Sequence, residues 1–220
     1  MVAMSQATED YLKAIYHLTT RGEAVTTGHL ARELGVSSPS VSAMVKRLED
    51  GALVDRPDAR SLRLTDSGER AALRVVRRHR LLETFLFRAA GVPWDELHAE
   101  AELLEHGLSE RLEQHIDAAL GHPTRDPHGD PIPPRDGRHD EDWGTPLAAA
   151  PSHSRFRVQR VSDRDSAALR HLGRLGIMPG AEIEVAEQEP FGGPRWVVAA
   201  GKRHALGGPL TALVHGHVLA

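Results

Sequence analysis

Apolar residues recur every three or four positions through the first 120 residues and at every second position in the last third of the chain. The first spacing predicts amphipathic helices, and the second predicts half-buried strands. Helices are expected at 7–20, 26–50, 65–91 and 95–120, and strands at 155–161, 182–188, 195–200 and 212–220. The pattern therefore predicts a mainly α chain with a small β domain at its carboxyl-terminal end.

Residues 26–50 contain a helix, a glycine turn and a second helix. Gly35 permits the tight turn, Ser37 or Ser38 can cap the second helix, and Pro39 falls in its first turn, where a missing N–H is harmless. Val41, Met44, Val45 and Leu48 face inward and leave an outward face of small hydroxyls ending in Lys-Arg. This face suits a recognition helix in the major groove of DNA. A purely structural helical hairpin is the alternative.

Two short β-runs follow, at 53–56 and 61–65, joined by the turn 57–60. With the preceding helices they predict a winged helix-turn-helix, and arginines on or beside the wing could meet phosphates. Few long side chains point outward from the second helix, so DNA shape is expected to carry much of the specificity. The residues expected to contact DNA are Thr27, Ser37, Ser38, Pro39, Ser40, Ser42, Ala43, Lys46, Arg47 and Arg60.

Histidine and glutamate gather between residues 79 and 106. His79 and Glu83 are four residues apart on one predicted helix. His98, Glu102, Glu105 and His106 follow on the next at offsets of four, three and one. Residues three or four apart share a helix face, and imidazole and carboxylate groups that converge between packed helices are how helical bundles build metal sites. Nitrogen and oxygen ligands favour Mn, Fe or Zn.

A solvated helix face is the alternative for this cluster. Glutamate is a common helix former, and amphipathic helices usually expose such residues. The chain has 14 histidines, so some of them are expected to lie near one another in the sequence by chance. The two interpretations are about evenly matched on the pattern alone.

Residues 121–153 are rich in Pro, Gly and Asp, which predicts a linker that is at best partly ordered and whose histidines do not bind metal. The alternating segments after it, with a short helix at 163–177, predict a small SH3-like β-barrel. His215 and His217 share one face of the last strand and are expected to be surface or barrel residues.

The helices at 81–87 and 95–120 carry more apolar surface than the core of one domain of this size needs to bury. The excess predicts a dimerisation surface.

Composition narrows the function classes. The chain has 220 residues, no cysteine and a net charge of −4, but residues 1–78 carry +2 and the remainder −6. The absence of cysteine excludes disulfides, Cys-ligated zinc and iron–sulfur clusters, and it fits a cytoplasmic protein. No apolar run approaches 18 residues, so no transmembrane helix is expected. The polar start, MVAMSQATEDYL, predicts no signal peptide.

The order of these parts, together with RHRLLETFL, LHAEAELLEH and RDPHGDPIP, resembles the diphtheria-toxin-repressor family of metal-dependent transcriptional repressors. The chain looks most like the three-domain manganese-responsive regulators of that family. The resemblance implies a winged helix-turn-helix domain at 1–73, a helical metal-binding and dimerisation domain at 74–122, a Pro/Gly-rich linker at 123–153 and an SH3-like (FeoA-type) domain at 154–220.

The resemblance also implies the metal ligands. The family's main regulatory site falls on Asp10, Glu102, Glu105 and His106, and its ancillary site on His79, Glu83 and His98, with Asp165, or alternatively Asp163, from the SH3-like domain. Iron-responsive members carry Met and Cys where this chain has Asp10 and Glu102. Replacing soft sulfur by oxygen suits Mn(II). Some short manganese regulators carry a second carboxylate where this chain has Lys13, so a binuclear site of that type is not expected.

The function implied is a cytoplasmic, Mn(II)-activated homodimeric repressor of metal-uptake genes that binds a palindromic operator in double-stranded DNA. No membrane and no organic substrate are expected as partners. Fe(II) is the alternative activator, and Co(II), Zn(II) or Cd(II) could bind in vitro. Two rival classes are a metal-dependent enzyme built on the His/Glu helices and a metal-blind winged-helix regulator with a small-molecule pocket.

Overall fold

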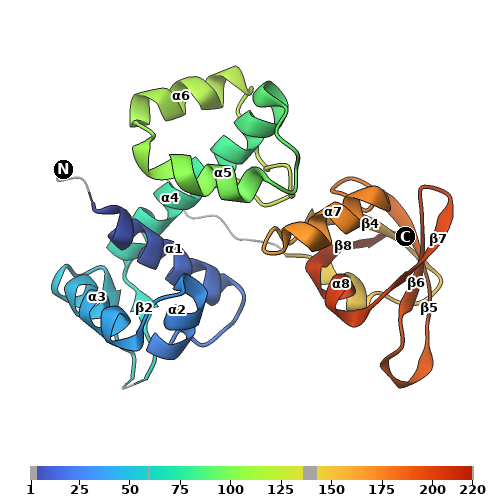
Figure 1. Cartoon of the computed structure of the whole chain (residues 1–220), viewed down its shortest axis with the longest axis horizontal. Helices are drawn as coiled ribbons and strands as arrows, with labels where there is room; N and C mark the ends of the chain where they lie inside the picture. Colours follow the sequence, from blue (N-terminus) through green and yellow to red (C-terminus); the bar gives the residue numbers. More distant parts are fainter. Residues whose placement is uncertain (1–3, 59, 136–142, 220) are drawn as a thin grey trace. The chain divides into compact units, whose positions relative to one another are not determined.

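The structure is a computed structural model that describes residues 4–58, 60–135 and 143–219 (Figure 1). These residues form two compact units. The first contains the chain up to His79, Leu104–Glu113 and the short stretch that begins at Pro133. The second contains Arg80–Leu103, Gln114–Ile132 and the carboxyl-terminal residues. No helix among the described residues is long and apolar enough to span a membrane.

The amino-terminal part of the first unit has the expected helix-turn-helix and wing. Helices α1 (Gln6–Thr20), α2 (Thr27–Leu34) and α3 (Ser38–Asp50) precede strands β1 (Val54–Asp55) and β2 (Arg63–Leu64), which pair antiparallel. Ser5, Thr26 and Ser37 cap the three helices through their side-chain oxygens. The buried core is mostly aliphatic and includes Leu12, Ile15, Leu30, Val41, Val45 and Leu48.

Helix α4 (Asp66–Phe85) is followed by a π-helical turn, Leu86–Ala90, which ends at Gly91 in the left-handed region. The start of the helix lies against the backbone that leads into the wing. A Cβ at Gly68 would lie only 1.9 Å from the carbonyl oxygen of Leu53. Thr65 accepts a hydrogen bond from the N–H of Gly68 at this start. The absence of a side chain at residue 68 therefore sets how closely α4 approaches the wing.

The single helix expected at 95–120 is wrong. The structure has α5 (Leu97–Leu104), a 3₁₀ turn at Glu105–Gly107 and α6 (Glu110–Ala119). Leu108 is extended, and the hydroxyl of Ser109 accepts from the N–H of Leu112, so Ser109 starts a new helix. The sequence HGLSER contained both signals, a glycine and an N-cap serine, and Glu105 and His106 therefore lie on a turn.

Residues 124–135 of the expected linker are ordered, and several are buried. Backbone hydrogen bonds join Ile132 to Thr124 and Asp126 to Asp130. Asp130 pairs with two buried arginines, Arg80 and Arg160. A Cβ at Gly129 would lie 2.0 Å from the carbonyl oxygen of Gln159, so this segment packs backbone to backbone on strand β4 (Ser154–Val161). The expectation of a loosely ordered linker is wrong here, while 136–142 lie outside the described residues.

The carboxyl-terminal part is the expected SH3-like domain. Its strands form one antiparallel sheet in the order β3-β8-β4-β5-β6-β7, with helices α7 (Ser166–Arg174) and α8 (Gly208–Leu213) beside it (Figure 1). The strands are β3 (Thr145–Pro146), β4 (Ser154–Val161), β5 (Glu182–Gln188), β6 (Arg195–Ala199), β7 (Lys202–Leu206) and β8 (Val214–Leu219). Phe156, Leu169, Leu172, Ile177 and Val197 form its buried core.

Candidate metal centre and DNA-binding face

Asp10, Glu105 and His106 form a candidate metal site within the first unit. Each offers one ligand atom, and these atoms lie within 4.8 Å of one another. The Nε2 of His106 lies 2.9 Å from Asp10 Oδ1 and 3.4 Å from Glu105 Oε1. Helix α1 carries the aspartate, and the 3₁₀ turn carries the other two residues. A site made this way joins the DNA-binding helices to the turn before α6.

Glu9 orients the imidazole of His106. Its carboxylate lies 2.7 Å from Nδ1, and a carboxylate at neutral pH only accepts, so Nδ1 carries the proton. In neutral imidazole the lone pair is then on Nε2, between two carboxylates. This Nε2 is buried and has no hydrogen-bond partner among the described residues. A carboxylate on one nitrogen and an open second nitrogen is the usual arrangement of a metal-binding histidine, so a divalent cation fits here.

Glu105 is fully buried between two further groups. Its Oε1 lies 2.5 Å from the Nζ of Lys13, and its Oε2 lies 2.6 Å from the Nδ1 of His79. Burial raises the pKa of Glu105, but hydrogen bonds and charge from His79 and Lys13 outweigh burial and leave that pKa below its usual value. Glu105 is therefore held ionised, as a metal ligand must be.

Glu102 lies beside a different part of this cluster. It groups with His79 and Glu105 rather than with Asp10 and His106. Its carboxylate is also 3.7 Å from the Nε2 of His98, one turn earlier on α5. The structure thus brings Asp10, Glu105 and His106 together, and Glu102 is not one of that group.

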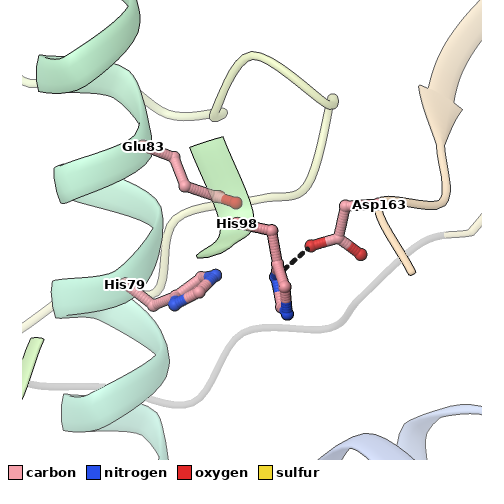
Figure 2. Close-up of side chains that lie close together, drawn as sticks. All are labelled: His79, Glu83, His98 and Asp163. Carbon is pink, nitrogen blue, oxygen red and sulfur yellow. Dashed lines mark ion pairs between the residues drawn. The ribbon is translucent and has the colours of Figure 1, made fainter. Parts of the chain in front are cut away.

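A second candidate site contains His79, Glu83, His98 and Asp163 (Figure 2). His79 and Glu83 lie one turn apart on α4, His98 is on α5, and Asp163 follows β4. The Nδ1 of His98 is 3.0 Å from Asp163, and Figure 2 shows the four side chains converging on the space between α4 and the loop that carries Asp163. Of the two aspartates considered in the SH3-like domain, Asp163 is the one in this group.

Asp165, the residue expected to be a ligand, lies outside this cluster. Its side chain caps α7, where Oδ1 accepts from the N–H groups of Ala167 and Ala168, and the residue is exposed. An aspartate immediately before a helix is the favoured N-cap, and that role occupies the carboxylate. The choice of Asp165 over Asp163 is not supported by this geometry.

A third group, Glu83, Asp126 and His128, is entirely buried. The Nε2 of His128 donates to the carbonyl oxygen of Trp94 at 2.7 Å, since a carbonyl can only accept. Its Nδ1 faces Glu83 Oε1 at 3.5 Å and has no hydrogen-bond partner among the described residues. A histidine whose second nitrogen is fixed by a carbonyl is again oriented as metal ligands are.

The charges in this third group are shared among carboxylates, a histidine and a buried arginine. Burial raises the pKa of Asp126 well above its usual value, the neighbouring Asp130 and Glu83 raise it further, and His128 and Arg80 lower it. The Nε of Arg80 lies 3.9 Å from Asp126 Oδ2. Burial lowers the pKa of His128, but Glu83, Asp126 and Asp163 outweigh burial and raise it to about 10. A divalent cation bound here would have to displace the proton of His128.

The DNA-binding face agrees with the expected outward residues of α3. Ser37, Ser38, Pro39, Ser40, Ser42, Ala43, Lys46 and Arg47 are exposed, while Val41, Val45 and Leu48 are buried. On the wing, Arg63 donates two hydrogen bonds to the carboxylate of Asp55. The Nε of Arg56 lies 2.5 Å from Glu49 Oε1. Arg60, at the tip, is exposed and has no ion pair among the described residues. Thr27, in the first turn of α2, is partly exposed.

Large apolar side chains are exposed on the helices between 85 and 119. They are Phe87, Leu103, Leu104 and Leu112, with exposed fractions of 41%, 77%, 46% and 51%. Thus α5, α6 and the π-helical turn after α4 each carry at least one large exposed apolar side chain.

Sequence reasoning missed three residues of these sites. Glu9 precedes Asp10 on α1, and its only signal was its place within one turn of a proposed ligand. Asp126 and His128 are two apart in an extended segment, so they share a side, but the Pro and Gly around them indicated a linker. Contacts with Glu83 and Trp94, far away in the sequence, order that segment.

Comparison with known proteins gives three family models that together cover most of the chain. Residues 3–62 match the iron dependent repressor N-terminal DNA binding domain, residues 65–134 match the iron dependent repressor metal binding and dimerisation domain, and residues 145–215 match the FeoA domain. The Iron-dependent repressor IdeR of Mycobacterium tuberculosis is 34% identical over 214 residues, which cover 90% of this chain and 91% of that protein.

Two solved structures are also similar over nearly the whole chain. A manganese-dependent transcriptional repressor in complex with manganese has a TM-score of 0.88 and 41% sequence identity, and the match covers 96% of this chain and 100% of that chain. The manganese regulator SloR has a TM-score of 0.82 and 30% identity, with 98% and 100% covered.

Proposed function

Because the chain belongs to the iron-dependent repressor family, whose members are metal-dependent transcriptional repressors and not enzymes, we propose that it is a homodimeric repressor activated by Mn(II). The observation that carries the proposal is the Nε2 of His106, buried between two carboxylates and without a hydrogen-bond partner among the described residues. Asp10, Glu105 and His106 are the proposed ligands, with Glu102 beside them.

The residues of this site connect DNA binding to the metal. Asp10 lies on α1, which packs on the recognition helices through residues such as Leu12 and Ile15. Glu105 and His106 lie on the turn before α6. A bound divalent cation supplies the positive charge that removes repulsion among the carboxylates. If the DNA-competent arrangement binds metal about 100-fold more tightly, the population shifts by about 2.7 kcal/mol.

The choice of Mn(II) follows from the ligand atoms. Every residue in the three candidate groups offers oxygen or imidazole nitrogen, and none offers sulfur. Carboxylate oxygens suit Mn(II), whereas thiolate and thioether ligands favour softer metals. The relative of 41% identity is itself described as manganese-dependent. Fe(II) is the second candidate, because IdeR, which is 34% identical, is an iron-dependent repressor.

We further propose that Glu83 belongs to an ancillary metal site. Two sets of residues surround it, His98 with Asp163 and Asp126 with His128, and both include buried or partly buried nitrogen and oxygen atoms. The set with Asp126 and His128 is fully buried, and the Nδ1 of His128 has no hydrogen-bond partner among the described residues, which supports that set. His79, one turn before Glu83, would serve the set with His98.

DNA binding is assigned to α3 and the wing. The exposed serines and the N-terminus of α3 would contact phosphates, Lys46 and Arg47 would add charge, and Arg60 would reach the backbone beside the groove. Two heads in a dimer would read two halves of a palindromic operator about one helical turn apart, or a multiple of it.

The experiment that tests the proposal is DNA binding after complete metal removal. A DNA fragment is selected from a random-sequence pool with the full chain and Mn(II), and binding is then titrated with Mn(II), Fe(II) and Zn(II). We expect Mn(II) to restore binding at the lowest free concentration. Glu105→Ala should abolish metal-dependent binding without dissociating the dimer, and Asp10→Met with Glu102→Cys should shift the preference toward Fe(II). DNA binding that is unaffected by a chelator would refute the proposal.

A further inference from the structure

Glu113 is a buried carboxylate of the first unit and is in none of the candidate metal groups described above. It lies on α6 and is 7% exposed. Its Oε1 accepts a hydrogen bond from the Nε of Arg77 at 3.0 Å, and Arg77 also donates to the carbonyl oxygen of Pro133 at 2.7 Å. A buried carboxylate is costly unless its charge is compensated, and Arg77 supplies part of that compensation.

The second oxygen of Glu113 faces a guanidinium that Glu9 also faces. Arg78 lies between the two carboxylates, with its Nε 3.5 Å from Glu113 Oε2 and its Nη1 3.7 Å from Glu9 Oε1. Both distances are longer than an ordinary hydrogen bond, and the Nε of Arg78 has no hydrogen-bond partner among the described residues. The guanidinium is therefore held between two opposite charges by electrostatic attraction.

The other oxygen of Glu9 belongs to the metal site. Glu9 Oε2 accepts from the Nδ1 of His106 at 2.7 Å, and this bond leaves the Nε2 of His106 available for a metal. An arginine pairs with a carboxylate best through two parallel hydrogen bonds, which would use both oxygens of Glu9. Such a pair would compete with His106. Because Glu113 attracts Arg78 from the other side, the guanidinium stays 3.7 Å from Glu9.

We propose that Glu113 is a positioning residue for metal binding, because it shares Arg78 with Glu9 and so keeps Glu9 available to His106. The inference rests on the proposed function of the metal site that contains His106. Glu113 acts through two other side chains and is not itself a ligand. Loss of its charge releases the guanidinium to Glu9, and the imidazole then loses the acceptor that fixes the proton on Nδ1.

The test compares the Mn(II) affinity of the full-length chain with that of its variants, measured by calorimetry after metal removal. Glu113→Gln keeps an oxygen for Arg77 but removes the charge, and it should weaken Mn(II) binding about tenfold. Glu113→Gln combined with Arg78→Met also removes the competing guanidinium and should restore the affinity to near wild type. Asp117→Asn removes a buried carboxylate one turn later on α6, and this control should bind Mn(II) as wild type does.

Two further measurements separate positioning from the loss of one negative charge. Glu113→Asp keeps the charge but draws the carboxylate back from Arg78, so it should also weaken Mn(II) binding. Nitrogen NMR of the metal-free chain, at a pH at which imidazole is neutral, shows which ring nitrogen of His106 carries the proton, and His106→Gln assigns the signal. Wild type and the double variant should carry it on Nδ1, whereas Glu113→Gln should show both tautomers.

Thermal unfolding of the metal-free variants identifies those that fold. Wild-type affinity and a wild-type tautomer in a folded Glu113→Gln chain would overturn the inference. A double variant that folds but binds Mn(II) as weakly as Glu113→Gln would also overturn it, because the guanidinium would then not be the competitor. If Glu113→Gln does not fold, Glu113→Asp decides, and wild-type affinity in that variant contradicts the inference.

Asp10→Ala keeps this failure distinct from failure of the proposed function. The variant should bind one Mn(II) fewer per chain, as counted by metal analysis after gel filtration. If the count is unchanged, the site is not a metal site and the proposed function is wrong. If the count falls by one while Glu113→Gln and Glu113→Asp bind Mn(II) as wild type does, the function stands and Glu113 has only a structural role.

Discussion

At the residue scale, neighbouring side chains and one backbone carbonyl oxygen orient the candidate ligands. His106 depends on Glu9, and Glu105 depends on His79 and Lys13. His128 depends on the carbonyl oxygen of Trp94. Such contacts fix which atom of a side chain is presented, and sequence spacing does not reveal them. His79, Glu83 and Asp10 follow from spacing or from resemblance, whereas Asp126 and His128 depend on a fold that brings a distant segment to α4.

Glu9→Gln should weaken Mn(II) binding about 10- to 100-fold, because the amide cannot fix Nδ1 of His106 as a donor as the carboxylate does. Calorimetric titration of the metal-free chain measures the effect. Glu23→Gln, which removes an exposed carboxylate paired with Arg21, is the control and should bind Mn(II) as wild type does. Equal affinity of the two variants would contradict the role assigned to Glu9.

Glu105 should make the metal-free chain less stable in acid. The folded pKa of Glu105 is lowered, since His79 and Lys13 outweigh burial, so its contribution is fully present above the unfolded value of about 4.3 and is lost as the pH falls through the folded pKa. Glu105→Gln should therefore lower the free energy of unfolding by about 3 kcal/mol at neutral pH and by progressively less below about pH 4. Urea denaturation at a series of pH values checks this, and a difference that is constant with pH would refute it.

At the scale of elements, the turn between α5 and α6 is the largest difference from the predicted secondary structure. The 3₁₀ turn at Glu105–Gly107 lies in the same unit as α1, and both Glu105 and His106 reach Asp10 or its surroundings. Helical periodicity predicted one helix over 95–120, because Gly107 and Ser109 were not given their weight as helix-stop and helix-start signals.

Two basic residues near the end of α3 are expected to contact DNA phosphates. Lys46→Ala and Arg47→Ala should each weaken DNA binding about equally for all sequences and reduce the slope of log K against log salt by about 1, if each contacts a phosphate. Fluorescence anisotropy with labelled DNA at several salt concentrations measures the slope. Arg155→Ala, on strand β4 and paired with Glu182, is the control and should leave the slope unchanged.

At the scale of the whole molecule, the periodicity of the apolar residues was sufficient to predict the order of the domains. The first three helices, the wing and strands β4, β5 and β6 lie where their patterns predicted, because amphipathic faces must be buried in each domain. Strands β3 and β7 were not predicted, and the first residues of the strand expected at 212–220 belong to α8. Residues 124–135 could not be predicted, since their order comes from charge pairs with Arg80 and Arg160 rather than from apolar repeats. The domain boundaries at 73, 122 and 153 remain predictions.

The exposed apolar groups lead to a prediction about assembly. Leu112→Glu, alone and with Leu103→Glu, should weaken the dimer, because a carboxylate replaces an apolar side chain that is half or more exposed in the single chain. Sedimentation velocity measures the oligomeric state. Mn(II) binding should survive while DNA affinity falls. Leu12, which is buried in the same chain, is unsuitable for this test because its substitution would unfold the domain.

The glycine at 129 has a consequence for the sequences this fold tolerates. Its backbone has a φ of +91°, and any Cβ there would overlap the main chain of Gln159. Even alanine would push away the loop that brings Asp126 and His128 to Glu83. A saturation library at this codon, scored for regulated reporter expression, should therefore recover a single amino acid.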